Sequence, residues 1–149
     1  MARYTPPPEV EQIATALIDR YHPHLRGARI LYLFTDKEKK TGDEHINGSV
    51  SRLPRCAAYL ARLARPDWEG GEDKPVFNME IVLPRWQAAS GRLKHAIVDH
   101  ELRHLQTSSR GKLMVVPHTL EEFSDVIKCW GFYLEDRRHF AEVCVAALQ

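Results

Sequence analysis

The chain has 149 residues, of which 44% are hydrophobic, 28% charged and 9% aromatic. This ordinary globular composition and length favour a single domain spanning residues 1–149. Lys and Arg number 21 and Asp and Glu number 20, so the formal net charge of +1 predicts no global attraction to nucleic acid or to an anionic membrane. No sequence period dominates, which excludes collagen-like and coiled-coil proteins, and the apolar content excludes disordered ones.

The cysteines and the N-terminal sequence predict a cytoplasmic protein. Cys56, Cys129 and Cys144 are odd in number and lack C-x-x-C spacing, which favours free thiols in a reducing compartment. The first residues, MARYTPPP, contain no apolar signal core, and no apolar run is long enough for a membrane span.

The N-terminal half alternates helical and strand patterns. Apolar residues at helical spacing follow three prolines, and an apolar run rich in β-type residues comes next. The two histidines that flank Pro23 are expected to be surface polar groups. The predicted elements are a helix from Pro8 or Glu9 to about His22-Pro23, a strand at 29–34, an exposed connection at 36–43, a strand at 45–53, a helix at 55–65 and a surface loop at 66–75.

The C-terminal half is mainly helical. Alternating residues predict one more strand, and Thr119 followed by Glu122 fits a helix capping box. The predicted elements are a strand at 77–83, a helical turn at 84–87, a helix from about Gly91 to Thr107, a turn at 108–111, an extended piece at 112–116, a helix from Thr119 to about Trp130 and a helix at 135–148. The pattern as a whole predicts an α+β fold, with a small sheet segregated from several helices.

The HELRH sequence of residues 100–104 is the strongest chemical signal. On a helix, residues four apart differ by about 40° in direction and about 6 Å in rise, so His100 and His104 can bind one cation together. Glu101 points too far round the helix to be an easy third ligand, and it can instead act as general base on a water at an open coordination position. The apolar residues before the motif, Ile97 and Val98 among them, favour a buried helix over one whose histidines face solvent.

A catalytic zinc site needs a third protein ligand, and His118 is the preferred candidate. It follows His104 by fourteen residues and precedes the next capping box, where the chain can bend back over the metal. Glu121 and Glu122 are alternatives, because a Glu from a following helix can also close such a site. If His118 is the ligand, Glu122 would accept a hydrogen bond from the backbone N–H of Thr119 in the capping box, and Glu121 would hydrogen-bond a ligating imidazole.

Three motifs resemble those of the phage metallopeptidases. They are VDHELRH at 98–104, HTLEEF at 118–123 and WGFY at 130–133, against a family pattern of VDHEL-x-H, HD-x-EEF and GxW. The first two are also similar to Spartan and WLM proteases, in which the later histidine completes the zinc site. Thr119 stands where the family has Asp, and Tyr133 where it has Trp. The resemblance covers most of the chain and implies a minimal zincin-like fold, with a small sheet packed on several helices and the HExxH motif on a central helix.

These observations lead to the hypothesis of a zinc-dependent peptidase that binds one Zn²⁺ per chain and acts on a peptide or protein. The strand at 77–83, if it edges the cleft, would bind an extended peptide by strand addition. One alternative is a zincin-fold metal-binding module without catalysis. Another is a protease of DNA-associated proteins, which the balanced charge disfavours along with any nucleic-acid partner.

Overall fold

The computed structural model describes residues 4–42 and 44–117. By its internal contacts the chain divides into two compact units, Met1–Val116 and Pro117–Gln149, and the fold below is that of the first unit. The helices predicted after Thr119 lie outside the described residues. None of the helices in the described part combines the length and apolarity that crossing a membrane requires.

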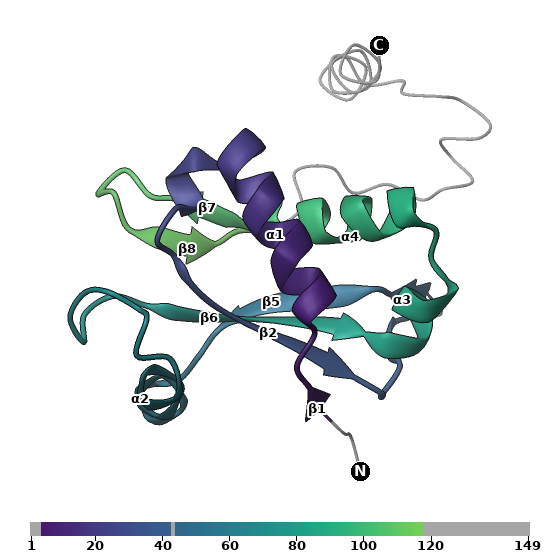
Figure 1. The fold of residues 1–149 in the computed structure, drawn as a ribbon, viewed down its shortest axis with the longest axis horizontal. Helices are drawn as coiled ribbons and strands as arrows, with labels where there is room; N and C mark the ends of the chain where they lie inside the picture. Colours follow the sequence, from purple (N-terminus) through teal and green to yellow (C-terminus); the bar gives the residue numbers. More distant parts are fainter. Residues whose placement is uncertain (1–3, 43, 118–149) are drawn as a thin grey trace. The chain divides into compact units, whose positions relative to one another are not determined.

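A four-stranded mixed sheet forms the centre of this unit (Figure 1). Its strand order is β1 (Tyr4–Thr5), β2 (Arg29–Thr35), β6 (Val76–Val82) and β5 (Gly48–Arg52). The central strands β2 and β6 are parallel, whereas β1 and β5 run antiparallel to their neighbours. Two small antiparallel pairs complete the strands described: β3 (Lys39–Thr41) with β4 (Glu44–Ile46), and β7 (Leu105–Thr107) with β8 (Leu113–Val115).

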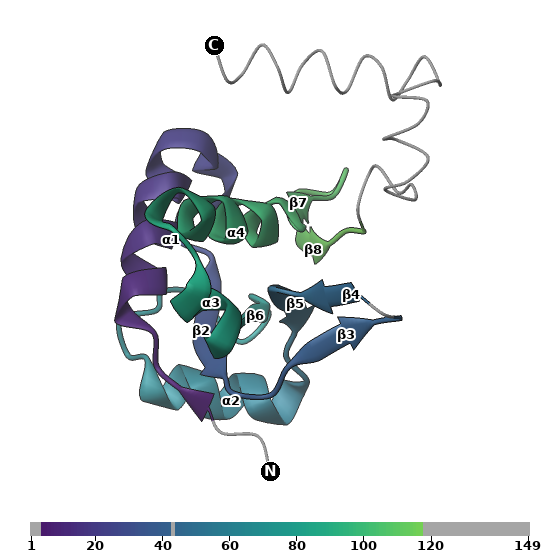
Figure 2. The same ribbon diagram turned by 90° about the vertical axis from the view of Figure 1, so that its right-hand side faces the viewer.

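Helices lie on both sides of the sheet (Figures 1 and 2). Helices α1 (Pro8–Tyr21) and α4 (Gly91–Arg103) pack against each other over one face, and α2 (Arg55–Ala64) lies toward the opposite face. The 3₁₀ helix η1 (Pro23–Leu25) leads from α1 toward β2, and the short helix α3 (Leu83–Ala88) leads from β6 toward α4.

The main core fills the space between the sheet and the pair α1 and α4. Its helical and strand members include Val10, Ala14, Ile30, Phe77, Met79, Ile81, Ile97, Val98 and Leu102. A smaller cluster of Ala58, Ala61 and Val76 attaches α2 to the sheet. The helical spacing of apolar residues in α4 therefore buries one side of this helix and leaves the rest available for a site.

The prediction of an α+β fold with a small sheet is confirmed, but three of the predicted elements differ in the structure. The helix expected to reach Thr107 ends at Arg103, because the next residues form β7 and pair with β8. The strand expected at 45–53 is divided into β4 and β5 at Asn47, whose carbonyl accepts a hydrogen bond from the backbone N–H of Val82 at 2.8 Å. Strand β3 lies within the charged segment that was expected to be a simple exposed connection.

Candidate active site

The HELRH motif lies at the C-terminal end of α4. The helix begins after Ser90, whose Oγ accepts a hydrogen bond from the backbone N–H of Leu93 at 3.2 Å. His100 and Glu101 belong to its last turn, and His104 is its C-cap residue. The ring centroids of His100 and His104 are 5.2 Å apart, with an angle of 77° between the ring planes. The four-residue spacing thus brings the two imidazoles together, as the sequence predicted.

The ring of His104 is oriented by the end of the β7–β8 pair. Its Nδ1 lies 2.6 Å from the backbone carbonyl oxygen of Val116. A carbonyl only accepts hydrogen bonds, so Nδ1 carries the proton and the lone pair of the neutral ring is on Nε2. Metal-binding histidines commonly donate their other ring N–H to a carbonyl in this way. In its neutral form His104 can therefore present the lone pair of Nε2 to a metal ion.

The distance between the two rings also fits a shared metal ion. Two imidazoles bound to one tetrahedral zinc, each with a Zn–N distance of about 2.0–2.1 Å, have ring centroids about 5 Å apart. The observed 5.2 Å meets this requirement. No group of three or more His, Cys, Asp and Glu residues suited to a metal is found within residues 4–42 and 44–117. His118, Glu121 and Glu122, the candidates for the third ligand, lie outside these residues.

Glu101 is a buried carboxyl group between the two histidines in sequence. Its exposed fraction is only 4%. Burial raises the pKa of Glu101 to about 7, although attraction to His104 and Lys39 offsets part of the rise. A general base is most effective when its pKa lies near the working pH. The environment of Glu101 thus suits the role that the sequence assigned to it.

Gly48 allows β5 to approach this carboxyl group closely. A Cβ atom at Gly48 would lie 3.5 Å from Oε1 of Glu101 and only 2.7 Å from the backbone carbonyl oxygen of Glu80. Any larger residue would therefore collide with β6 before it reached the site. The glycine at the start of β5 is thus what lets a strand cover Glu101 without a side chain between them.

Lys39 brings a positive charge close enough to Glu101 to offset part of the rise in the pKa of its carboxyl group. Its ammonium group donates a hydrogen bond to Oγ of Ser49 at 2.9 Å and forms an ion pair with the carboxylate of Glu80. The amide of Asn78 also donates to Glu80, at 3.3 Å. The sequence placed Lys39 in an exposed charged run, and nothing local in that run signals its contact with strands far along the chain.

His22 ties α1 to the helix that carries the motif. Its Nε2 lies 2.6 Å from Oδ1 of Asp99, and Oδ2 of Asp99 accepts a hydrogen bond from Nε of Arg103 at 2.8 Å. Burial by itself would raise the pKa of Asp99, but the hydrogen bonds from His22 and Arg103 outweigh it and hold this pKa below its usual value. The prediction that both histidines beside Pro23 are surface groups was wrong for His22, which is 4% exposed. His24 is exposed, and its Nε2 lies 3.0 Å from the carbonyl oxygen of Leu105.

Comparison with known protein families agrees with the motifs. The model of the family described as "Putative phage metallopeptidase" matches residues 2–146. The match covers nearly the whole chain, and the protein belongs to this family. The family name implies a metal cofactor and peptide or protein substrates. Neither the curated proteins nor the solved structures gave a significant match.

Proposed function

We propose that the protein is a zinc-dependent peptidase of zincin-like fold. His100 and His104 would supply two ligands to one Zn²⁺ per chain, and His118 the third. The observation that carries this proposal is a pair of neighbouring imidazoles, one of them oriented by a backbone carbonyl, beside a buried carboxyl group. The spacing of the rings, the tautomer of His104 and the family match all support it.

The third ligand is proposed from the sequence. His118 follows the described residues directly, and the similar motif of Spartan and WLM proteases uses a histidine at this point. Glu121 and Glu122 remain the alternatives. On this proposal residues 1–149 act as one metallopeptidase domain, because residues on both sides of Pro117 are needed for activity.

In the proposed reaction Glu101 moves the proton. Zinc, when bound, would polarise the scissile carbonyl and lower the pKa of the attacking water. Glu101 takes a proton from that water as the new C–O bond forms, and delivers it to the leaving nitrogen as the C–N bond breaks. Burial of Glu101 by β5 keeps bulk water from this proton, and the raised pKa makes the carboxyl group able to give the proton back.

An extended substrate would bind along β5 rather than along the strand first expected. The strand predicted at 77–83 corresponds to β6, which has β2 on one side and β5 on the other and therefore no free edge. Among the described strands, β5 pairs with β6 alone and is an edge of the sheet. Its first residue, Gly48, lies against Glu101. A peptide that added to this edge would thus run close to the general base.

The metal centre is tested by elemental analysis of purified protein. We expect about one zinc per chain in the wild type and none in the triple variant His100→Ala, His104→Ala, His118→Ala. The matched control is His95→Ala, since His95 is an exposed histidine on the same helix, with Nδ1 2.8 Å from the carbonyl oxygen of Gly91. Equal zinc in the triple variant and the wild type would refute the site.

The general base is tested separately from the metal. Glu101→Gln should keep its zinc and lose peptide hydrolysis by at least about 100-fold, the usual contribution of general base catalysis. Comparison of His118→Ala with Glu121→Gln and Glu122→Gln, by zinc content, identifies the third ligand. Hydrolysis that persists in Glu101→Gln at the wild-type rate would exclude the proposed mechanism.

A further inference from the structure

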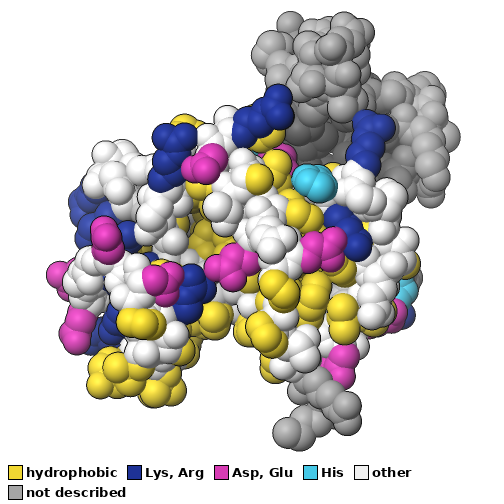
Figure 3. Space-filling model, in the orientation of Figure 1, with side chains coloured by type: hydrophobic (Ala, Val, Ile, Leu, Met, Phe, Trp, Pro, Cys, Tyr) yellow, Lys and Arg dark blue, Asp and Glu magenta, His cyan; other side chains and the backbone are white. Residues whose placement is uncertain are grey.

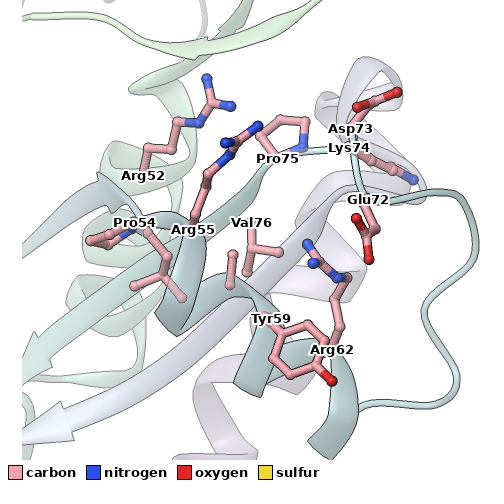
Figure 4. Close-up of a pocket in the computed structure, with 12 residues that line it drawn as sticks. Arg52, Pro54, Arg55, Tyr59, Arg62, Glu72, Asp73, Lys74, Pro75 and Val76 are labelled. Atoms are coloured by element: carbon pink, nitrogen blue, oxygen red, sulfur yellow. The ribbon is translucent and has the colours of Figure 1, made fainter.

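A second feature of interest is a pocket of about 800 Å³ on the side of the sheet where α2 lies (Figure 4). One wall is the end of β5 and the first turns of α2, and the other wall is the loop that leads into β6. This volume falls within the range of ligand-binding pockets. Its lining includes none of the residues proposed for the metal centre.

The pocket carries an excess of positive charge. Arg52, Arg55, Arg62 and Lys74 line it, against two acidic residues, Glu72 and Asp73. In the described part of the chain the three guanidinium groups have neither an ion pair nor a hydrogen bond, whereas Lys74 donates to the carbonyl of Gly27. Figure 4 shows Arg52 and Arg55 extending in the same direction from neighbouring elements. The planar guanidinium group is suited to binding phosphate by two hydrogen bonds.

An aromatic residue of α2, Tyr59, lies in sequence between two of these arginines. Arg55, Tyr59 and Arg62 follow the i, i+4, i+7 spacing of one helix face, and all three line the pocket. Tyr59 is 51% exposed, so its ring is available to a ligand. Leu60 and Leu63 are also exposed on α2 but are not among the residues that line the pocket. Hydrophobic side chains gather on the surface in the region of this helix (Figure 3, lower left).

The loop wall of the pocket is held in place by a buried arginine. Arg29 is 1% exposed and donates from Nη2 to the carbonyl of Glu69 at 2.8 Å and from Nη1 to the carbonyl of Gly71 at 3.0 Å. These hydrogen bonds join β2 to the loop some forty residues away. The backbone of this wall is therefore held in place without a ligand, which reduces the entropy lost on binding.

We propose that this pocket binds single-stranded nucleic acid, with the arginines on the phosphates and Tyr59 stacked on a base. A cationic groove with an exposed aromatic ring is the usual arrangement for this ligand. A duplex would use the charges but not the ring, because its bases are already stacked on each other. An acidic peptide would likewise leave Tyr59 without a specific role. This local excess of positive charge is not apparent from the balanced net charge of the whole chain.

The test is fluorescence anisotropy of the full chain with a labelled oligothymidylate of about 12 nucleotides, a typical length for single-strand binders. Between about 50 and 200 mM salt, three phosphate contacts predict a slope of log K against log salt of roughly −2. For the double variant Arg55→Gln, Arg62→Gln the slope should be less steep by roughly 1.4, because two phosphate contacts are removed. Tyr59→Ala should weaken binding by about 5-fold or more with the slope unchanged, and Tyr59→Phe should restore it.

Arg110→Gln is the matched control, because Arg110 is exposed, lies in the β7–β8 turn and does not line the pocket. It should bind as the wild type does, and all variants should melt at the wild-type temperature. The proposal would be overturned by no binding of the oligonucleotide at low salt, by pocket variants that bind no worse than Arg110→Gln, or by an oligoglutamate peptide that binds as tightly as the oligonucleotide. Equal affinity for a duplex, unaffected by Tyr59→Ala, would exclude the single-strand assignment.

Discussion

Replacement of Glu101 by glutamine should stabilise the metal-free protein at alkaline pH. Glu101 is 4% exposed, and its burial disfavours the charged form. Glutamine has nearly the shape of the protonated acid and stays neutral at every pH. The substitution therefore removes the cost of ionising a carboxyl group inside the protein and keeps the packing against Gly48.

The sign and size of the effect follow from the pKa. Because the pKa of Glu101 rises from 4.5 to about 7 on folding, the folded state binds more protons than the unfolded state between these values. This contribution to stability is complete below pH 4.5 and is lost as pH rises to about 7. The shift corresponds to at most about 3 kcal/mol. Glu101→Gln should thus match the wild type near pH 4 and exceed it by up to about 3 kcal/mol at pH 8.

Urea unfolding with a chelator present, at pH 4.5, 6 and 8, measures the difference directly. For a domain of this size about 3 kcal/mol corresponds to a rise in Tm of roughly 6–12 °C at pH 8. Glu72→Gln is the control, since Glu72 is exposed and should give no pH-dependent difference. If Glu101→Gln gave the same stability difference from wild type at pH 4.5 and pH 8, the carboxyl group would not be held in its neutral form and the reasoning would fail.

Three further predictions concern the strand contact, the helix contact and the metal. Gly48→Ala should lower the free energy of unfolding in urea by about 1–3 kcal/mol, because the new Cβ would lie 2.7 Å from the carbonyl oxygen of Glu80. The control is Gly71→Ala, whose Cβ would meet nothing within 4 Å and which should be near neutral. A double-mutant cycle of His22→Ala and Asp99→Ala in metal-free protein should give a coupling energy of about 1–3 kcal/mol, and a value near zero would contradict the contact. Removal of zinc with a chelator should lower the Tm of the wild type in scanning calorimetry, and should leave the Tm of the triple histidine variant unchanged. Zinc added back at 1,000 times its Kd should restore about 4 kcal/mol of stability to the wild type.

The sequence predicted those parts of the site that depend on local spacing. The four-residue spacing of His100 and His104 was enough to place both rings on one side of a helix, because helical geometry fixes that relation. The apolar pattern before them was enough to predict the helix itself. The α+β fold class followed in the same way from the order of helical and strand patterns.

Contacts between distant residues could not be predicted in this manner. The burial of Glu101 depends on the close approach of β5 at Gly48. The nearby positive charge is that of Lys39, which belongs to the β3–β4 hairpin and contacts Ser49 and Glu80 on the main sheet. His22 looked like a surface residue because its partner, Asp99, is 77 residues away. Each of these pairings is set by the packing of elements, which hydropathy patterns along the chain do not encode.

The early end of α4 explains the orientation of His104. Had the helix continued to Thr107, the carbonyl of His104 would have accepted the backbone N–H of Ser108, as helical geometry requires. Ser108 donates instead to the carbonyl of Lys112 at 2.7 Å, which closes the turn between β7 and β8. The carbonyl of His104 then accepts the N–H of Val116 at 2.7 Å, and the carbonyl of Val116 accepts Nδ1–H of the His104 ring at 2.6 Å. The break in the helix that the sequence did not predict is therefore what fixes the tautomer on which the proposed metal site depends.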